Sequence, residues 1–259
     1  MLGDCIRRVY GDSYPLPEYY EAAHVAELLK KSLLHSELAL NGQAQSVATI
    51  STQLEQVGDI TADGTMTMVD QAYRGHRVLR QLGVRMSEIY RRLDIAGLQL
   101  YALALHHIVQ QQAGAAGAVV TGILPTYFHR RASMSGFDSV KARVGAVVMH
   151  MPLAALPTRE VYLPQVYIQQ LQRVYNQLDL DRKISAGSSQ LVAASSVVLR
   201  DAKPANGLLR LRFDSLAEDF PELIAQAQTD PLFEVTYLDL PLADPAVEQA
   251  TAIARDMGY

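Results

Sequence analysis

Hydrophobic and polar residues change their spacing along the chain, and each change predicts an element of secondary structure. Between Gly64 and Val69, methionines alternate with threonines, which is typical of a strand with one buried face. From Val78 to Leu93, apolar residues recur every three or four positions with arginines largely opposite them, as in an amphipathic helix. An Arg-Gly pair lies between the two segments. The sequence therefore predicts a strand, a tight turn and a helix in succession.

The first 155 residues continue this pattern. Two short helices precede a hairpin that is split at Asn41-Gly42. The run from Leu98 to His106 is almost entirely apolar, which favours a strand buried on both faces. The predicted order is strand, strand, strand, helix, strand, helix, strand, strand, so we expect an α/β fold, a mixed sheet with helices on its faces. The expected helices are 4–10, 18–33, 75–93 and 108–116, and the expected strands are 36–40, 45–53, 64–70, 98–106, 118–124 and 143–151.

The remaining residues indicate a second, smaller unit. An amphipathic helix is expected over 164–179, and 181–189 has the composition of a linker. A last helix is expected from Asp244, whose carboxylate is placed to cap it. We expect a first domain over 1–155, a connecting helix and linker over 156–188, and a partial second domain over 189–259. The other elements expected in that last part are strands at 190–199, 207–213 and 232–240 and a helix at 216–228.

Composition excludes several classes of function. The 259 residues are 49% apolar, enough to fill the cores of two domains. A net charge of −4 gives no general affinity for nucleic acid or anionic lipid. The single cysteine, Cys5, excludes an internal disulfide and cannot by itself form a zinc site, so no metal is expected. No apolar run is long enough to span a bilayer and no leader is visible, so we expect a cytoplasmic protein without a membrane partner.

The segment MVDQAYRGHRVLRQL, which begins at Met68, resembles the acetyl-coenzyme A loop of the GNAT superfamily of N-acetyltransferases. HHIVQQQAGAAG, VVTGIL and YLDLPLADP agree with that family further along the chain. The resemblance is strongest to bacterial proteins in which a GNAT domain precedes an incomplete second GNAT-like domain. It implies an acyl-CoA N-acyltransferase fold, a splayed sheet whose opening takes the pantetheine of coenzyme A.

The resemblance also implies a co-substrate and the residues that bind it. Acetyl-CoA or another acyl-CoA would be the acyl donor, and an unidentified amine would be the acceptor. The pyrophosphate would lie on the first-turn N–H groups of the helix, which lack intrahelical partners and carry partial positive charge. Carried over to this sequence, the cofactor-binding residues are Met68, Val69, Tyr73, Arg74, Gly75, His76, Arg77 and Val78.

The chain departs from the family pattern in the loop and beyond it. Arg77 and Leu79 stand where the family has small residues that let the backbone approach the phosphates. These side chains either weaken cofactor binding or, in the case of Arg77, supply charge to a phosphate. Ala113 stands where many members of the family carry a tyrosine. The sequence therefore leaves open which residue would act as acid or base in the reaction.

His106 and His107 are the candidate catalytic bases, because they end the apolar strand near the expected site and imidazole titrates near neutral pH. A hydrogen-bonded pair at a strand end is the structural alternative. Other side chains could line an acceptor pocket or could be packing and loop residues. These are Tyr14, Tyr19, Tyr20, Tyr127, His129, Arg130 and Arg131.

Two functions therefore stay open for this chain. The first is an acyltransferase that moves an acetyl or acyl group from coenzyme A to an amine by direct attack in a ternary complex. The second is a degenerate, non-catalytic GNAT-like module that binds acyl-CoA or a protein partner in regulation. An uncovered sheet edge would favour a homodimer in either case.

Overall fold

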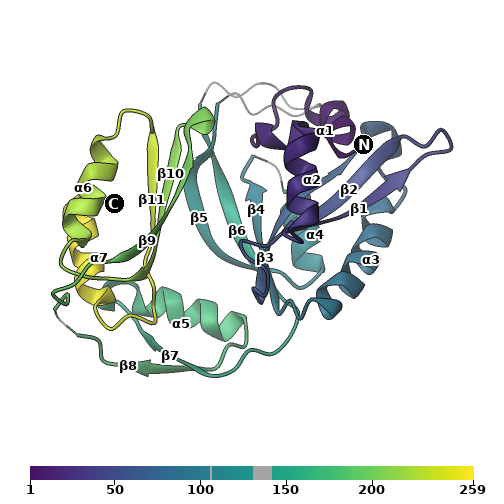
Figure 1. Cartoon of the computed structure of the whole chain (residues 1–259). Helices are drawn as coiled ribbons and strands as arrows, with labels where there is room; N and C mark the ends of the chain where they lie inside the picture. The colour runs from purple at the N-terminus through teal and green to yellow at the C-terminus, as the bar shows by residue number, and fades with distance from the viewer. Residues whose placement is uncertain (106, 131–141, 189) are drawn as a thin grey trace. The chain divides into compact units, whose positions relative to one another are not determined.

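A six-stranded sheet organises the first of two compact units, Met1–Ala155 and Leu156–Tyr259 (Figure 1). The computed structural model describes residues 1–105, 107–130, 142–188 and 190–259. The strand order is β1-β2-β3-β4-β6-β5, with β3 and β4 parallel and every other neighbouring pair antiparallel. The strands are β1 Leu34–Leu40, β2 Ser46–Gln53, β3 Thr61–Val69, β4 Gly97–Leu103, β5 Val119–Phe128 and β6 Val144–Pro152.

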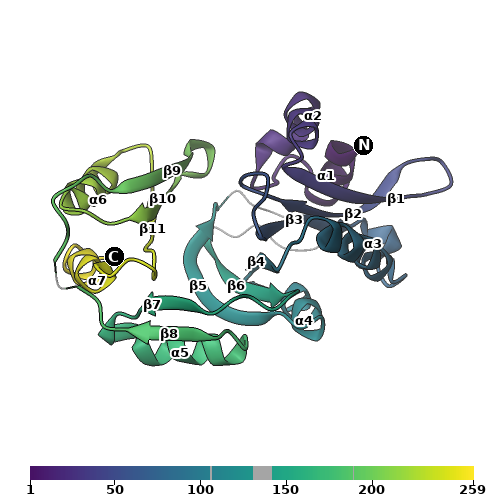
Figure 2. The same ribbon diagram turned by 60° about the horizontal axis from the view of Figure 1, so that its bottom comes forward.

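Helices cover both faces of this sheet (Figure 2). Cys5 and Ile6 of α1 pack in one cluster with Met66 and Met68 of β3, so both methionines face the same side, as their spacing predicts. Met86 of α3 belongs to a separate cluster on the other face. The helical segments are α1 Leu2–Tyr10, η1 Pro17–Tyr20, α2 Ala22–Lys30, η2 Gln71–Tyr73, α3 Val78–Arg92 and α4 Ile108–Ala115.

The predicted order of elements in this unit is confirmed, and the differences lie at element ends. The helix expected over 18–33 is interrupted at Glu21, whose backbone is extended, and it stops at Lys30 before β1 begins. The helix expected from residue 75 begins at Val78, because Gly75 and Arg77 have positive φ angles of 83° and 59° that no α-helix accommodates. The local backbone, rather than the hydrophobic stripe, therefore decides where these helices start.

The two parallel strands pair over only part of their length. The register runs from Thr61 opposite Gly97 to Gly64 opposite Leu100, and both strands then continue without further pairing to each other. A Cβ on Gly64 would lie 2.4 Å from Leu100 Cδ2, so the glycine leaves room for the Leu100 side chain at the last pair. Beyond it, Met66 has a φ of 43° at a bulge in the β2–β3 ladder, which bends β3. The sheet is therefore splayed between β3 and β4.

The second unit contains two small sheets and its own core. Its three-stranded sheet has the order β11-β10-β9, and its helices α6 and α7 cover a core built around Phe220 and Val247. The sequence analysis missed the parallel pair β7 and β8, because a four-residue strand has little local signal before its partner is known. Its elements are β7 Arg159–Tyr162, η3 Gln165–Tyr167, α5 Ile168–Gln177, β8 Arg182–Ser185, β9 Val197–Lys203, η4 Pro204–Asn206, β10 Leu208–Ser215, α6 Phe220–Thr229, β11 Val235–Asp239 and α7 Val247–Asp256.

Part of the second unit has the same topology as the centre of the first. The series β9, β10, α6, β11, α7 corresponds to β2, β3, α3, β4, α4, with an antiparallel pair followed by a parallel pair in both. In the second unit the parallel pairing lasts to the end of β11 at Asp239. The carboxylate of Asp239 also contacts Arg210 Nε of β10 at 2.6 Å. The second pair is therefore closed where the first is open.

Candidate functional site

The segment between β3 and α3 turns through two left-handed residues. Asp70 begins it, and its carboxylate accepts the Ala72 N–H at 3.1 Å. Gly75 has a φ of 83°, which glycine adopts without steric cost. Arg77 is in the αL region, with φ 59° and ψ 21°, at the N-cap of α3. The chain therefore reverses within a few residues and presents the start of α3 at the end of β3.

This turn leaves a row of backbone amides unused. Within the described part of the chain, the N–H groups of residues 75–79 have no hydrogen-bond partner. The next two, from Arg80 and Gln81, donate to the Arg77 carbonyl at 3.1 and 3.3 Å. The positive end of the helix dipole lies at the same place. These amides form a seat for an anion such as a phosphate.

Side chains hold the turn without covering the seat. Arg74 Nε donates to the Val69 carbonyl at 3.3 Å, and His76 Nδ1 lies 3.1 Å from the Arg74 carbonyl oxygen. The Tyr73 hydroxyl accepts from Asn41 Nδ2 of the β1–β2 turn at 3.2 Å. No atom outside the neighbouring residues would lie within 4 Å of a Cβ on Gly75. A ligand therefore has room to reach the backbone, among exposed arginines.

The opening between β3 and β4 begins four residues before the end of β3. It leads to the same edge of the sheet as the anion seat formed by the amides of residues 75–79, because both lie beyond the carboxyl end of the paired region. Met68 is 4% exposed, and its side chain packs beneath α1, so only its backbone borders the opening. Val69 follows, half-buried, and Val78 begins α3. The predicted residues from Met68 to Val78 are thus contiguous around the turn.

The candidate histidines are only partly described. His106 lies outside the described residues. His107 is exposed at the N-cap of α4, where its side chain makes no capping hydrogen bond. Ala113 is buried in α4 among Ala118 and Met149, so the helix presents no phenol there. A catalytic role for His106 or His107 stays a prediction.

Other aromatic candidates make contacts within the first unit. Tyr127 of β5 stacks on Tyr101 of β4, with ring centroids 5.4 Å apart and an interplanar angle of 9°. Tyr20 is used locally, since its hydroxyl donates to the Gly11 carbonyl at 2.7 Å. Arg131 lies outside the described residues, whereas His129 and Arg130 are the first two residues after β5, which ends at Phe128.

Tyr14 packs in the cluster between α1 and β3. Its ring lies edge-on to Tyr10 and Tyr19, with centroids 5.0 and 6.4 Å away, and its backbone N–H donates to the Tyr20 hydroxyl at 3.1 Å. Burial raises the pKa of Tyr14, and it raises the pKa of the neighbouring Tyr10 to about 12. The bulge of β3 had one signal in the sequence, Gly64, because a glycine inside a strand often marks a bulge or a close backbone approach.

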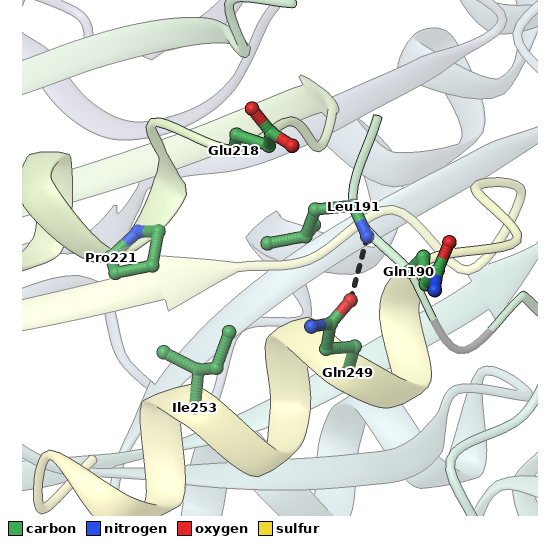
Figure 3. A pocket seen from close by; sticks show the side chains of 6 residues that line it. All are labelled: Gln190, Leu191, Glu218, Pro221, Gln249 and Ile253. Carbon is green, nitrogen blue, oxygen red and sulfur yellow. Dashed lines mark hydrogen bonds between the residues drawn. The ribbon is translucent and has the colours of Figure 1, made fainter. Parts of the chain in front are cut away.

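A cavity of about 460 Å³ lies in the second unit at the start of α6 (Figure 3). Its charged side chain is the Glu218 carboxylate, and Figure 3 shows Gln249 of α7 accepting the Leu191 N–H at 2.6 Å. The nearby backbone amides are engaged by the protein itself: the N–H groups of Leu216 and Ala217 donate to Asp244 Oδ2 and Ser196 Oγ. This cavity therefore lacks the chemistry of an anion seat.

The fold and the open turn of the first unit agree with one family. The first unit has an acyl-CoA N-acyltransferase-like fold. Its parallel central pair, the splay beyond Gly64 and the amide-lined turn into α3 are the features that the GNAT resemblance implies. The resemblance concerns the fold, and the acceptor and the reaction are separate questions.

No protein-family model and no curated protein sequence matches the chain. Among solved structures, the ribosomal-protein-S18-alanine N-acetyltransferase from Escherichia coli aligns with 52% of this chain and 79% of its own, at 16% identity and a TM-score of 0.41. Ard1 from Thermoplasma volcanium aligns over 58% and 92%, at 18% identity and 0.43. The ribosomal-protein-S5-alanine acetyltransferase from Vibrio fischeri aligns over 58% and 85%, at 11% identity and 0.45. All three are similar to little more than half of this chain.

Two other features are absent from the described ranges. Within them, no group of three or more His, Cys, Asp and Glu side chains is arranged to hold a metal ion. None of the helices in those ranges combines the length and the apolar character that crossing a membrane requires.

Proposed function

We propose that the first unit binds an acyl-CoA and transfers its acyl group to an amine. The observation that carries this proposal is the combination of unused amides at residues 75–79 with the opening that begins after Gly64 and Leu100. A thioester cofactor with a diphosphate needs both an anion seat and a slot for its pantetheine arm. Either feature alone would suit many ligands, whereas the two at one sheet edge suit coenzyme A.

In this proposal each part has a separate task. The amides of residues 75–79 bind the pyrophosphate, with Arg74 and Arg77 adding positive charge around it and His76 lying beside them. The arm lies between β3 and β4, which brings the thioester toward the bulge of β3. Backbone N–H groups near Met68 and Val69 polarise the thioester carbonyl. Holding amine and thioester together lowers the barrier by several kcal/mol.

For the second unit we propose a partial GNAT-like domain that has no acyl-CoA site of its own. Its shared topology supports the relationship, and its engaged amides and paired strands argue against binding. The chain would then bind one acyl-CoA. A regulatory module that binds acyl-CoA without turnover is the alternative function, and the same experiment separates the two.

Isothermal titration of the full chain with acetyl-CoA tests the proposal first. We expect one site per chain with micromolar affinity. Thiol release in the presence of a panel of primary amines then tests transfer. Binding with turnover supports the acyltransferase, binding without turnover supports the regulatory module, and the absence of heat together with no thermal shift contradicts both.

A further inference from the structure

The cavity at the start of α6 combines apolar and polar side chains (Figure 3). Its lining residues come from three segments of the second unit and are Gln190, Leu191, Glu218, Pro221, Gln249 and Ile253. Leu191, Pro221 and Ile253 are apolar and half-buried. The volume of about 460 Å³ lies in the range of small-molecule sites, which are mostly apolar with a few polar groups. The cavity therefore has the size and composition of a binding site for a small ligand.

Glu218 carries a carboxylate that the protein itself does not use. Within the described part of the chain, this carboxylate has no hydrogen-bond or ion-pair partner. Three neighbouring carboxylates, those of Asp219, Asp244 and Glu248, accept backbone N–H groups at 2.7–2.8 Å. These three hold segments of the second unit together, whereas Glu218 is exposed at the cavity. Its carboxylate is therefore available to a ligand.

The segments that line the cavity carry negative charge without a basic side chain to offset it. Residues 190–196, 216–224 and 244–253 contain five acidic residues and no Lys, Arg or His. The basic residue of α7 is Arg255, in its last turn and beyond the lining residues. Uncompensated negative charge around a concave, partly apolar surface raises the local concentration of cations. The cavity therefore favours a positively charged ligand, the opposite of the seat at residues 75–79.

Gln249 adds a hydrogen-bond donor to the same cavity. Its Oε1 accepts the Leu191 N–H at 2.6 Å, which fixes the orientation of the side-chain amide. Within the described residues, the Nε2 group of that amide donates to no acceptor. Figure 3 shows Glu218 above and Gln249 below the side chain of Leu191. A charged acceptor and a neutral donor thus border one apolar surface.

We propose that this cavity binds an α-amino amide with an apolar side chain, which is the chemistry of the first residue of a peptide. The ammonium group pairs with the Glu218 carboxylate, and the adjacent carbonyl oxygen accepts from Gln249 Nε2. The apolar side chain packs on Leu191, Pro221 and Ile253. The acidic surroundings repel a free carboxylate, so the amide is preferred to the amino acid itself. The site lies wholly within the second unit and does not depend on the proposed acyltransferase function.

Titration of the isotope-labelled full chain with leucinamide, followed by NMR, tests the site at about pH 6.5, where the α-amino group is protonated. The signals of the Leu191 N–H and the Gln249 side-chain amide should shift with a Kd of about 1 mM. Isopentylamine, which lacks the amide, should bind about fivefold more weakly. N-acetylleucinamide, which lacks the charge, should bind at least about tenfold more weakly. Tighter binding of the amidated tripeptide Leu-Gly-Gly would identify a peptide end as the ligand, and weaker binding a single residue.

Glu218→Gln and Glu222→Gln are matched variants, because each removes one negative charge near the start of α6. Glu218→Gln should weaken leucinamide binding at least about tenfold. Glu222→Gln should change it by no more than about twofold, since Glu222 does not line the cavity. The inference is overturned if the wild-type chain shows no saturable shift, if both variants weaken binding equally, or if N-acetylleucinamide binds as tightly as leucinamide. Because the titration needs no acetyl-CoA, these outcomes leave the proposed function of the first unit unaffected.

Discussion

The junctions β3–α3 and β10–α6 have the same topology but differ in whether their backbone amides are hydrogen-bonded within the protein. In the first, the amides of residues 75–79 are unused and arginines surround them. In the second, Asp244 and Ser196 accept the amides of Leu216 and Ala217. A strand followed by a helix thus leaves backbone amides that could bind an anion. Whether these amides stay free depends on whether side chains from other segments accept their hydrogen bonds.

The strands show the same contrast. β3 and β4 lose their pairing beyond Gly64 and Leu100, whereas β10 and β11 stay paired to Asp239. Asp239 contacts both Arg210 and Arg212 of β10, at 2.6 and 3.8 Å. A ligand that needs an opening between strands therefore has one in the first unit and none in the second.

Asp244→Ala should have the largest effect, on the second junction. The Asp244 carboxylate accepts the N–H groups of Leu216 and Ala246, both at 2.8 Å. Losing these bonds should lower the free energy of unfolding of the second unit by about 2–3 kcal/mol. Urea denaturation measures it, with the exposed Asp256→Ala as the control. An unchanged midpoint would show that this carboxylate does not hold the junction.

Gly75→Val should break the first junction. A β-branched residue at a φ of 83° is strained by about 1–2 kcal/mol, which converts to a loss of roughly five- to thirtyfold in acetyl-CoA affinity. Gly58→Val is the matched control, since Gly58 has a φ of 96° and equally open surroundings in the turn before β3. Equal losses in both variants, by isothermal titration, would remove the loop from the binding site.

Acid should weaken the second junction selectively. Hydrogen bonds from the Ser196 hydroxyl and N–H hold the pKa of Asp219 below its usual value of 3.8. The folded pKa is the lower one, so this stabilisation is present above about pH 4 and is lost as pH falls through the folded pKa. Urea denaturation at pH 5 and pH 3 should show the change, and Asp219→Asn should reduce it. A pH response unaltered by Asp219→Asn would contradict this assignment.

Surface ion pairs should contribute least to the difference between the units. Arg85 of α3 contacts Glu37 of β1 at 2.6 Å, and Arg200 of β9 contacts Asp230 at the same distance. Both arginines are about half exposed or more, at 68% and 47%. We expect Arg85→Ala and Arg200→Ala each to leave the midpoint of thermal denaturation nearly unchanged, because water and salt screen exposed ion pairs. A clear fall in that midpoint for either variant would mean that its pair is better shielded from water than its exposure indicates.

The sequence by itself determined the elements of the first unit and their order. Helical and strand periodicities are local, so the stripe from Val78 to Leu93 and the alternation around Met66 identify α3 and β3 without knowledge of their partners. The resemblance located the turn at Gly75, because the motif that carries it is one contiguous segment of the sequence. The prediction that Asp244 caps the last helix was wrong, because α7 begins at Val247 with Ala246 at its N-cap and no side-chain capping bond; the Asp244 carboxylate instead accepts the N–H groups of Leu216 and Ala246.

Only the tertiary structure decided what these elements can do. The closed second junction depends on Ser196 and Asp244 contacting the segment between β10 and α6, which local periodicity does not encode. The short strands β7 and β8 exist as strands because they pair with each other. Tyr14 packs in one cluster with Met66 and Met68 of β3, about fifty residues further along the chain, because α1 and η1 pack on the sheet. Contacts between distant segments are set by burial and shape, and these arise only when the whole unit folds.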